Sequence, residues 1–313
     1  MYINSVGHYI PEKVVDNKYF EQLHGFDDNW LFKRTGILER RRATSEDINV
    51  MAINAVSSAK GKIPYDISEV DTIVGATYSY KDTLNTIAHQ VQHEFDIKNT
   101  RALTVSSACS SLINALEVAQ AYIISGKSKK AIVVASEHNS AYSDDSDKVS
   151  GHLWGDGAVA FFISKERLSE DDIEIKDIKT KGLGTVGRSI EGVKLEPAKD
   201  GITMPFGRDV FNWACKYMTE IVKDVVEENH YKEEDIDYVI PHQANVRIIE
   251  NVRKQLGFSN EQVLTNIEKC GNTGCASVGI VFSQNQEKFR KGNKIALTVF
   301  GGGYSCGAVL MEK

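Results

Sequence analysis

The sequence predicts an α/β fold in which two similar halves combine β-sheets with covering helices. Strand-like apolar runs alternate with helical stretches along the 313 residues, a pattern typical of mostly parallel sheets covered on both faces. The order also repeats: Val-Asp-Thr-Ile at 70–73 corresponds to Ile-Asp-Tyr-Val at 236–239, and Gly-Ala-Val recurs in the last strand of each half. We therefore expect a duplicated unit, with halves at residues 1–170 and 171–313.

Four predicted strands in each half support this duplication. In the first half they lie at 70–75, 102–105, 130–135 and 157–163, and a helix from about Leu112 to Ser125 follows the second strand. In the second half the corresponding strands lie at 236–240, 263–267, 294–300 and 307–311. A Gly- and charge-rich segment at 171–207 joins the two halves.

Composition excludes several classes of protein. Apolar residues make up 42% of the chain and charged residues 26%, as in ordinary globular proteins. The net charge of −6 argues against nonspecific nucleic-acid binding, which needs an excess of cations. No run approaches the roughly 18 apolar residues of a membrane helix, and residues 1–15 lack the pattern of a signal peptide. We expect no membrane or nucleic-acid partner.

The five cysteines are scattered and odd in number, which disfavours a disulfide framework. We therefore expect a reduced, cytoplasmic protein. Cys270 and Cys275 fit no ordinary zinc spacing and have no second cysteine pair beside them, so we expect no metal site.

One cysteine has a setting suited to chemistry. Cys109 lies among small residues between a predicted strand and a predicted helix. The free N–H groups and dipole at a helix N-terminus favour the thiolate over the thiol. A lone cysteine among small residues can also be a buried apolar filler. The choice between the two interpretations depends on whether other chemically suited residues occur elsewhere in the chain.

Three further segments lie at strand ends, where ligands bind in open α/β sheets. His242 follows the predicted strand 236–240, and Asn272 lies in a turn that corresponds to the Cys109 turn. Three glycines, 301–303, follow the strand 294–300 and can aim backbone N–H groups at a developing oxyanion. The structural alternatives are a core histidine and an Asn-Thr-Gly turn.

Together these segments resemble the thiolase superfamily, and most closely its β-ketoacyl-acyl-carrier-protein synthase III family. The resemblance covers nearly the whole chain and rests on Asn29–Ile37, Glu39–Arg41, Ala108-Cys109, Trp154–Ala158, Pro241–Asn245, Gly271–Thr273 and Phe300–Gly303. It implies a thiolase-like fold, with duplicated βαβαβαββ halves in α-β-α-β-α layers.

The resemblance implies a decarboxylative Claisen condensation. Cys109 would accept an acyl group from acyl-CoA, and the acyl-cysteine would react with malonyl-acyl carrier protein to give 3-oxoacyl-acyl carrier protein, as in fatty-acid initiation. His242 and Asn272 match the residues that hydrogen-bond the malonyl thioester oxygen. The N–H groups of Cys109 and Gly302 match the oxyanion hole. Acyl-CoA is a substrate, and no cofactor is expected.

The resemblance also implies binding residues and a homodimer. Residues that match coenzyme A contacts are Trp30, Arg34, Lys148, Gly207 and Asn245. Residues expected to dock the acidic acyl carrier protein are Arg247, Arg253 and Lys254. Lys148 departs from the arginine that is usual in the family, and it cannot stack as a planar guanidinium.

Three positions that are often aromatic in the family carry smaller residues here: Leu84, Leu112 and Cys306. We expect them to line and widen the acyl pocket, with Leu84 beside the active site of the partner subunit. A wider pocket predicts medium-length or branched acyl donors.

Two alternatives remain open from the sequence. The first is a specialised ketosynthase or acyltransferase of secondary metabolism on the same fold. The second, from a different class, is a noncatalytic partner protein, although such proteins tend to lose the nucleophile or the donors that this chain keeps. A hydroxymethylglutaryl-type synthase is disfavoured because residues 75–93 contain no glutamate.

Overall fold

The computed structural model describes residues 1–25 and 27–313. The repeated elements of the first half are β1 (Tyr2–Tyr9), α3 (Ile48–Lys60), β4 (Thr72–Ala76), α4 (Ile87–Glu94), β5 (Arg101–Val105), α5 (Ser111–Ile124), β6 (Lys130–Glu137) and β7 (Gly157–Ser164). Those of the second half are β8 (Ile173–Gly182), α6 (Gly207–Glu228), β11 (Tyr238–Pro241), α7 (Val246–Leu256), α8 (Ile267–Cys270), α9 (Ser277–Gln284), β12 (Lys294–Gly301) and β13 (Ser305–Glu312).

Each half carries an insertion after its first strand. The first consists of β2 (Lys13–Asp16), α1 (Asn17–His24), α2 (Asp28–Thr35) and β3 (Glu39–Arg42), and the second is the hairpin of β9 (Lys194–Glu196) and β10 (Gly201–Thr203). Short 3-10 helices lie at Ile67–Glu69, Asn139–Ala141, Ser189–Glu191, Glu233–Asp235, Gly274–Ala276 and Gln286–Lys288. Among the described residues, no helix is long and apolar enough to cross a membrane.

The strand order shows the duplication directly. The main sheet runs β11-β12-β13-β8-β1-β7-β6-β4-β5, and its two parts meet only through two residue pairs between β1 and β8. Read outward from that junction, β1-β7-β6-β4-β5 corresponds to β8-β13-β12-β11. The pairing sense agrees as well, since β1/β7 and β6/β7 are antiparallel like β13/β8 and β12/β13, whereas β4/β6 is parallel like β11/β12.

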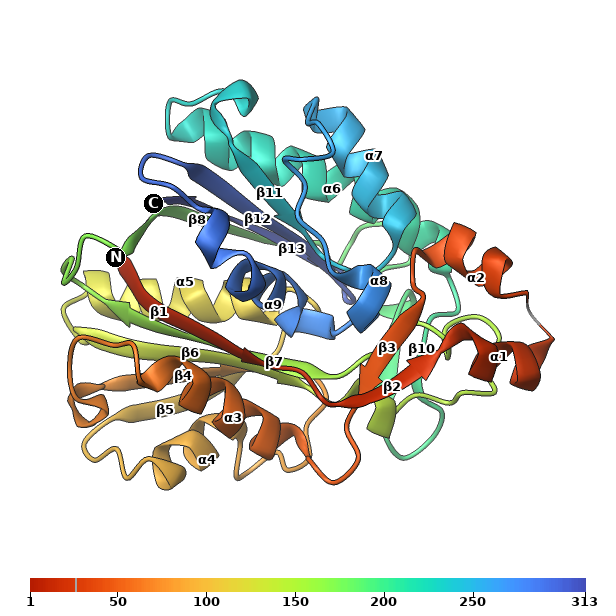
Figure 1. Ribbon diagram of the computed structural model, residues 1–313, viewed down its shortest axis with the longest axis horizontal. Helices are drawn as coiled ribbons and strands as arrows, with labels where there is room; N and C mark the ends of the chain where they lie inside the picture. Colours follow the sequence, from red (N-terminus) through yellow and green to blue (C-terminus); the bar gives the residue numbers. More distant parts are fainter. Residues whose placement is uncertain (26) are drawn as a thin grey trace.

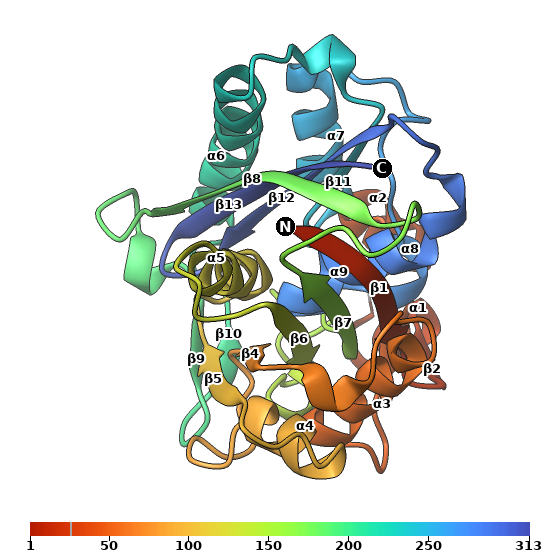
Figure 2. The same cartoon turned by 90° about the vertical axis from the view of Figure 1, so that its left-hand side faces the viewer.

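The helices form three layers around the two parts of the sheet (Figures 1 and 2). The central pair, α5 and α9, lies between them, and one apolar cluster joins these helices to both parts. A second cluster covers the first half beneath α3 and α4, and a third covers the second half beneath α6 and α7. The α-β-α-β-α arrangement expected of a thiolase-like fold is confirmed.

Helix ends follow from local sequence. Asp47 caps α3 by accepting hydrogen bonds from the N–H groups of Asn49 and Val50, at 2.9 and 3.0 Å. Asn245 caps α7 by accepting from the Arg247 N–H at 2.8 Å. Gly257 ends α7 with φ of +75°, a conformation that suits glycine. These caps fix where α7 begins, directly after the strand end that carries His242.

Seven of the eight predicted strands are present, and two expectations need correction. The sheets are mixed rather than mostly parallel, because the strand that closes each half pairs antiparallel with both of its neighbours. The predicted strand 263–267 is reduced to one parallel bridge between Val263 and Val239. Beyond it, the side chain of Gln243 accepts the N–H groups of Asn266 and Ile267, which turns the chain into α8. The predicted boundary between residues 170 and 171 stays a prediction.

Candidate active site

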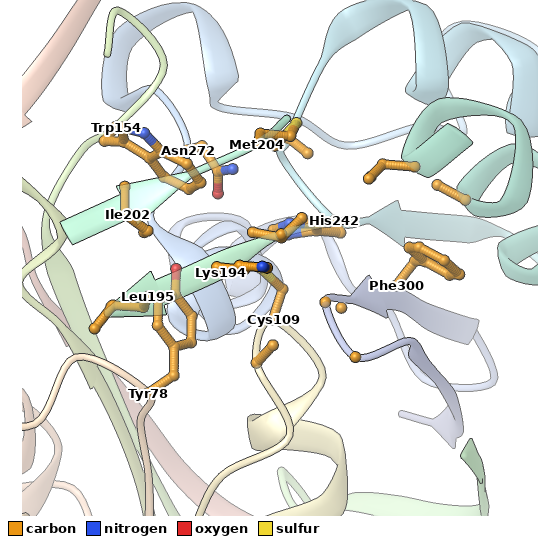
Figure 3. A pocket seen from close by; sticks show the side chains of 18 of the residues that line it. Tyr78, Cys109, Trp154, Lys194, Leu195, Ile202, Met204, His242, Asn272 and Phe300 are labelled. Carbon is orange, nitrogen blue, oxygen red and sulfur yellow. The ribbon is translucent and has the colours of Figure 1, made fainter. Parts of the chain in front are cut away.

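Segments far apart in the sequence converge on one cavity of about 330 Å³. Cys109, His242, Asn272 and Gly302 all line it, so the four residues predicted for the chemistry lie together (Figure 3). The rest of the wall is largely apolar and comes from Leu195 and other residues of the β9–β10 hairpin, from α6, and from the start of α7. Such a wall excludes water from groups that must act on a developing charge.

The Cys109 turn, residues 106–110, joins β5 to the buried helix α5. Ala108 has φ of +49°, a left-handed conformation that non-glycine residues rarely adopt. Serine hydroxyls hold the turn: Ser110 Oγ donates to Ser107 O at 2.7 Å, and Ser111 Oγ donates to Ala108 O at 2.6 Å. Ser110 and Ser111 therefore satisfy carbonyl groups of the turn.

The glycines after β12 lie against this turn. A Cβ on Gly301 would lie 2.8 Å from Ser107 O and 2.9 Å from the backbone nitrogen of Cys109. Only glycine fits there without moving the turn. Gly302 lines the cavity beside Ala108, which places it near the residue with which it is predicted to form the oxyanion hole.

Burial dominates the acid–base properties of the thiol. It raises the pKa of Cys109 to about 12, and the nearby Glu137 carboxyl contributes further. A hydrogen bond with the Tyr78 hydroxyl acts in the opposite direction on this pKa but is outweighed. The expectation of a thiolate favoured by the helix terminus is therefore wrong for the unliganded protein, in which the neutral thiol prevails at neutral pH.

His242 enters the cavity from the end of β11. Its backbone N–H donates to Thr298 O at 2.8 Å, and its ring Nδ1 lies 2.8 Å from Ser277 Oγ. Burial lowers the pKa of His242 to about 4, so the ring is neutral at neutral pH. When the Ser277 hydroxyl donates to Nδ1, the ring proton resides on Nε2 and can be donated to a substrate oxygen.

The Asn272 loop, residues 271–274, is held by the first half of the chain. The Asn272 N–H donates to Leu153 O at 2.9 Å, and Asn272 O accepts from the Gly155 N–H at 2.9 Å. The side-chain Oδ1 accepts from the Gly274 N–H at 3.0 Å. Because the oxygen is used within the loop, Nδ2 is the group that remains to donate into the cavity.

The predicted coenzyme A residues lie outside the cavity lining formed by the described residues. Trp30 and Arg34 share α2, where the Arg34 guanidinium stacks 4.5 Å from the centre of the Trp30 ring. Asn245 caps α7, Gly207 begins α6, and Lys148 is exposed in the loop before β7. The α2 and α7 elements are in contact, since the Arg247 guanidinium donates to Lys33 O at 3.3 Å.

The acyl-pocket prediction needs correction. Leu112 is fully buried in the central cluster between the two parts of the sheet, and Cys306 is fully buried beneath α6 and α7. Both side chains pack between layers of the fold and do not line the cavity. Leu84 is 82% exposed in its own chain, and its placement beside a partner's active site stays a prediction.

The three predicted docking cations differ in availability. Lys254 and Arg247 are exposed on α7. Arg253 instead forms an ion pair with Glu250 at 3.0 Å and donates to Phe258 O at 2.8 Å. Its charge stabilises the end of its own helix, so it is a poor candidate for contact with a partner.

Two residues that sequence reasoning missed lie beside the nucleophile. Tyr78 lines the cavity just beyond the end of β4, and Glu137 is buried at the end of β6. Burial raises the pKa of the Glu137 carboxyl to about 7. Tyr78 follows β4, which pairs with β5, and Glu137 ends β6, which pairs with β4 on its other side. The strand-end rule that singled out His242 could have identified both residues.

Comparison with known proteins agrees with this geometry. Family models described as 3-oxoacyl-[acyl-carrier-protein (ACP)] synthase III and its C-terminal part match residues 103–184 and 226–313. A model of the β-ketoacyl synthase N-terminal domain matches residues 29–143. The curated β-ketoacyl-[acyl-carrier-protein] synthase III of Clostridium perfringens strain SM101 is 34% identical, covering 98% of this chain and 97% of its own length.

Solved structures give the same result. The 3-oxoacyl-[acyl-carrier-protein] synthase III from Aquifex aeolicus VF5 has a TM-score of 0.93 at 35% identity, over 100% of this chain and 99% of that one. The synthase III from Thermus thermophilus also has a TM-score of 0.93, at 28% identity and the same coverage. The chain belongs to the β-ketoacyl-[acyl-carrier-protein] synthase III family.

Proposed function

We propose that this protein is an acyl-transferring condensing enzyme that joins an acyl group from acyl-CoA to malonyl-acyl carrier protein and so initiates fatty-acid synthesis. One observation carries the proposal: a thiol, an imidazole, a carboxamide and a glycine loop meet in one apolar cavity. Relatives of nearly full length named synthase III favour this role over a specialised ketosynthase. A noncatalytic partner would not need to retain all four groups.

The first half-reaction is a thioester exchange. The Cys109 sulfur attacks the acyl carbonyl, the bond from carbonyl carbon to coenzyme A sulfur breaks, and the thiol proton ends on the released coenzyme A. The developing oxyanion is stabilised by the N–H groups of Cys109 and Gly302. Because burial raises the pKa of Cys109, deprotonation accompanies attack rather than preceding substrate binding.

The second half-reaction forms the carbon–carbon bond. The malonyl carboxylate leaves as carbon dioxide, and its electron pair becomes an enolate at the thioester. His242 Nε2–H and Asn272 Nδ2 donate to the enolate oxygen, where charge appears only during reaction. The enolate carbon attacks the acyl-cysteine, and the Cys109 sulfur leaves and regains a proton. The steps are redox-neutral, so they call for no resident cofactor.

The substrate arm is proposed to enter beside α7. Ala244 and Ile248 line the cavity at the start of this helix, and its outer face contacts α2, which carries Trp30 and Arg34. A nucleotide on α2 and a pantetheine arm along Asn245 and Gly207 would then lead to Cys109. The exposed cations Arg247 and Lys254 are the proposed contacts for an acidic carrier protein.

We further propose a cytoplasmic homodimer. The edge strand β5 exposes part of its apolar side chains. Leu84 is exposed in the loop before α4, and this loop is tied to β5 by the hydrogen bond from Thr104 Oγ1 to Thr86 Oγ1 at 2.8 Å. A partner that pairs with this edge would cover both. Light scattering is expected to give about 70 kDa, twice the 34.8 kDa of one chain; a mass near 35 kDa at micromolar concentration would contradict the dimer. All five cysteines are free, in keeping with a reducing compartment.

The function is tested by supplying acetyl-CoA and malonyl-acyl carrier protein to the purified chain. We expect an acetyl adduct on Cys109 by peptide mass spectrometry and, with both substrates, release of 3-oxobutyryl-acyl carrier protein. Absence of any Cys109 adduct across a series of acyl-CoA donors would refute the proposal.

A further inference from the structure

Tyr78 occupies the catalytic cavity without a role in the proposed chemistry. It lies in the segment directly after β4 and contributes to the wall together with Leu195, Ile202 and Trp154. Figure 3 shows its phenol ring extending from below toward the space between Leu195 and Cys109. Its effect on substrate binding depends on whether the ring can move aside.

The backbone around Tyr78 is fixed by Glu137. One carboxyl oxygen accepts the Tyr78 N–H at 3.2 Å, and the other accepts the Ser79 N–H at 3.2 Å and the Thr77 hydroxyl at 3.2 Å. Ser79 Oγ donates to the same carboxyl group. A fully buried carboxyl group therefore ties down three consecutive residues, and the main chain that carries the ring is held in place.

The ring itself is fixed from two further sides. The Tyr78 hydroxyl donates to Asn139 Oδ1 at 2.8 Å, and Asn139 Nδ2 in turn donates to Gly155 O at 2.9 Å and Asn272 O at 3.2 Å. A Cβ on Gly274 would lie 2.4 Å from the Tyr78 hydroxyl oxygen. The phenol is thus wedged against the Asn272 loop, and its hydroxyl lies close enough to the Cys109 thiol to influence the pKa of that thiol.

This position matters because an acyl thioester extends in two directions from the reacting carbon. In the proposed function the pantetheine arm runs toward α7, past Ala244 and Ile248. The acyl chain must then extend away from α7, into the region bounded by Tyr78, Leu195 and Ile202. A rigid aromatic ring beside the sulfur removes the space that the outer methylene groups of a longer chain would need.

We infer that Tyr78 determines the acyl-chain length of this enzyme by closing the far side of the cavity, so that Cys109 accepts short acyl groups such as acetyl and propionyl and rejects medium-length ones. The inference rests on the proposed function and names the substrate class of the same site. It reverses the expectation drawn from Leu84, Leu112 and Cys306, because Leu112 and Cys306 are buried outside the cavity and Leu84 is exposed in its own chain.

The test measures loading of Cys109 from acetyl-CoA and octanoyl-CoA separately, by intact-protein mass spectrometry over time. The parent protein is expected to load acetyl at least roughly 10-fold faster than octanoyl, since several excluded methylenes each weaken binding. Tyr78→Ala should raise the octanoyl-to-acetyl ratio by about 10-fold or more. Tyr78→Phe is the matched control: it keeps the ring and should keep the preference for the short donor.

Different failures have different meanings. A parent protein that loads neither donor refutes the proposed function itself. A parent that loads octanoyl as fast as acetyl, or an unchanged ratio in Tyr78→Ala, refutes the length limit alone. Octanoyl loading by Tyr78→Phe equal to that of Tyr78→Ala would also overturn it, because ring volume would not be the cause. Should Tyr78→Ala fail to fold in a thermal melt, Tyr78→Leu removes the ring with less loss of volume and must show the same change in ratio.

Discussion

The Cys109 turn and the Asn272 loop occupy equivalent places in the two halves, yet they are built differently. Each precedes one of the two buried central helices, α5 and α9. The Cys109 turn is held by serine hydroxyls around a left-handed Ala108. The Asn272 loop is held by backbone hydrogen bonds, with left-handed glycines at 271 and 274.

Both sites also depend on the opposite half of the molecule. Ser305, on β13 of the second half, lies 2.6 Å from Ser110 Oγ and donates to Ser107 O at 3.1 Å. The Asn272 loop bonds to Leu153 and Gly155 of the first half. The two halves therefore supply equivalent turns that carry different side chains, a thiol and a carboxamide, and reciprocal contacts hold each turn against the opposite half.

The largest expected effect is the loss of acyl loading at the Cys109 turn. Cys109→Ala should abolish acyl loading, because no other group at the turn can form the thioester, while the small change in volume leaves the fold intact. Peptide mass spectrometry after incubation with acetyl-CoA measures this, and a thermal melt serves as the folding control. Acylation of the variant at another residue would show that the nucleophile lies elsewhere.

The second largest expected effect is a slower condensation after a change in the Asn272 loop. Asn272→Ala should lower the condensation rate by about 10² to 10³, the usual cost of one lost donor to a developing oxyanion. Acyl loading should change far less, because the enolate forms only in the second half-reaction. Rates of 3-oxoacyl-acyl carrier protein formation and of loading are compared in the same preparation. Equal losses in both steps would mean that the loop shapes the whole cavity rather than the enolate site.

A pH effect tests His242, which lines the cavity together with Cys109 and Asn272. Burial lowers the pKa of His242 to about 4, below the 6.5 of an exposed histidine. Between these values the unfolded chain binds one more proton than the folded chain, so stability falls as the pH falls from 6.5 to 4, by about 3 kcal/mol from this residue.

Denaturant titrations of the parent and His242→Asn across that pH window measure the contribution. The variant should lose stability less steeply as the solution is acidified. Burial also lowers the pKa of His152 to about 4, but that fall occurs in both proteins and cancels in the difference. Parallel pH profiles would place His242 in a solvated environment and contradict its assignment.

The smallest expected effect tests the contact between halves at the Cys109 turn. Ser305→Ala removes the hydroxyl that links β13 to Ser107 and Ser110, and should lower the free energy of unfolding by about 1 kcal/mol. Loading should slow modestly, with condensation of the preloaded enzyme unchanged. A condensation defect larger than the loading defect would show that the reciprocal contacts do not act separately on the two sites.

The sequence predicted the main elements, and the four residues that it proposed for the chemistry line one cavity. Buried strands such as β6 and β7 are continuous apolar runs, and Cys109 and His242 were expected where the predicted strands before them end. The sequence did not predict which residues line the cavity. Alignment with a family gives the position of a residue along the chain but not the direction of its side chain. Whether Leu112 faces the cavity or the neighbouring layer depends on how α5 packs in the folded protein.

Tyr78 was missed for a related reason. Its place after β4 is visible in the sequence, but its effect depends on Glu137 and Asn139, about 60 residues away, which hold the ring in place. The β9–β10 hairpin likewise brings Leu195 and Ile202 into the cavity from a segment that reads only as a polar connection. Neither contact leaves a periodic pattern along the chain.

The central claim is that the Cys109 turn serves acyl loading and the Asn272 loop serves condensation. A pulse and chase on Asn272→Ala tests it most directly. The variant is loaded with acetyl-CoA, freed of excess donor and mixed with malonyl-acyl carrier protein, and the mass of the intact chain is followed over time. We predict that the acetyl group stays on Cys109 long after the parent enzyme has transferred it. Release of 3-oxobutyryl-acyl carrier protein from the variant at the parent rate, or failure of the variant to become acetylated, would contradict the account.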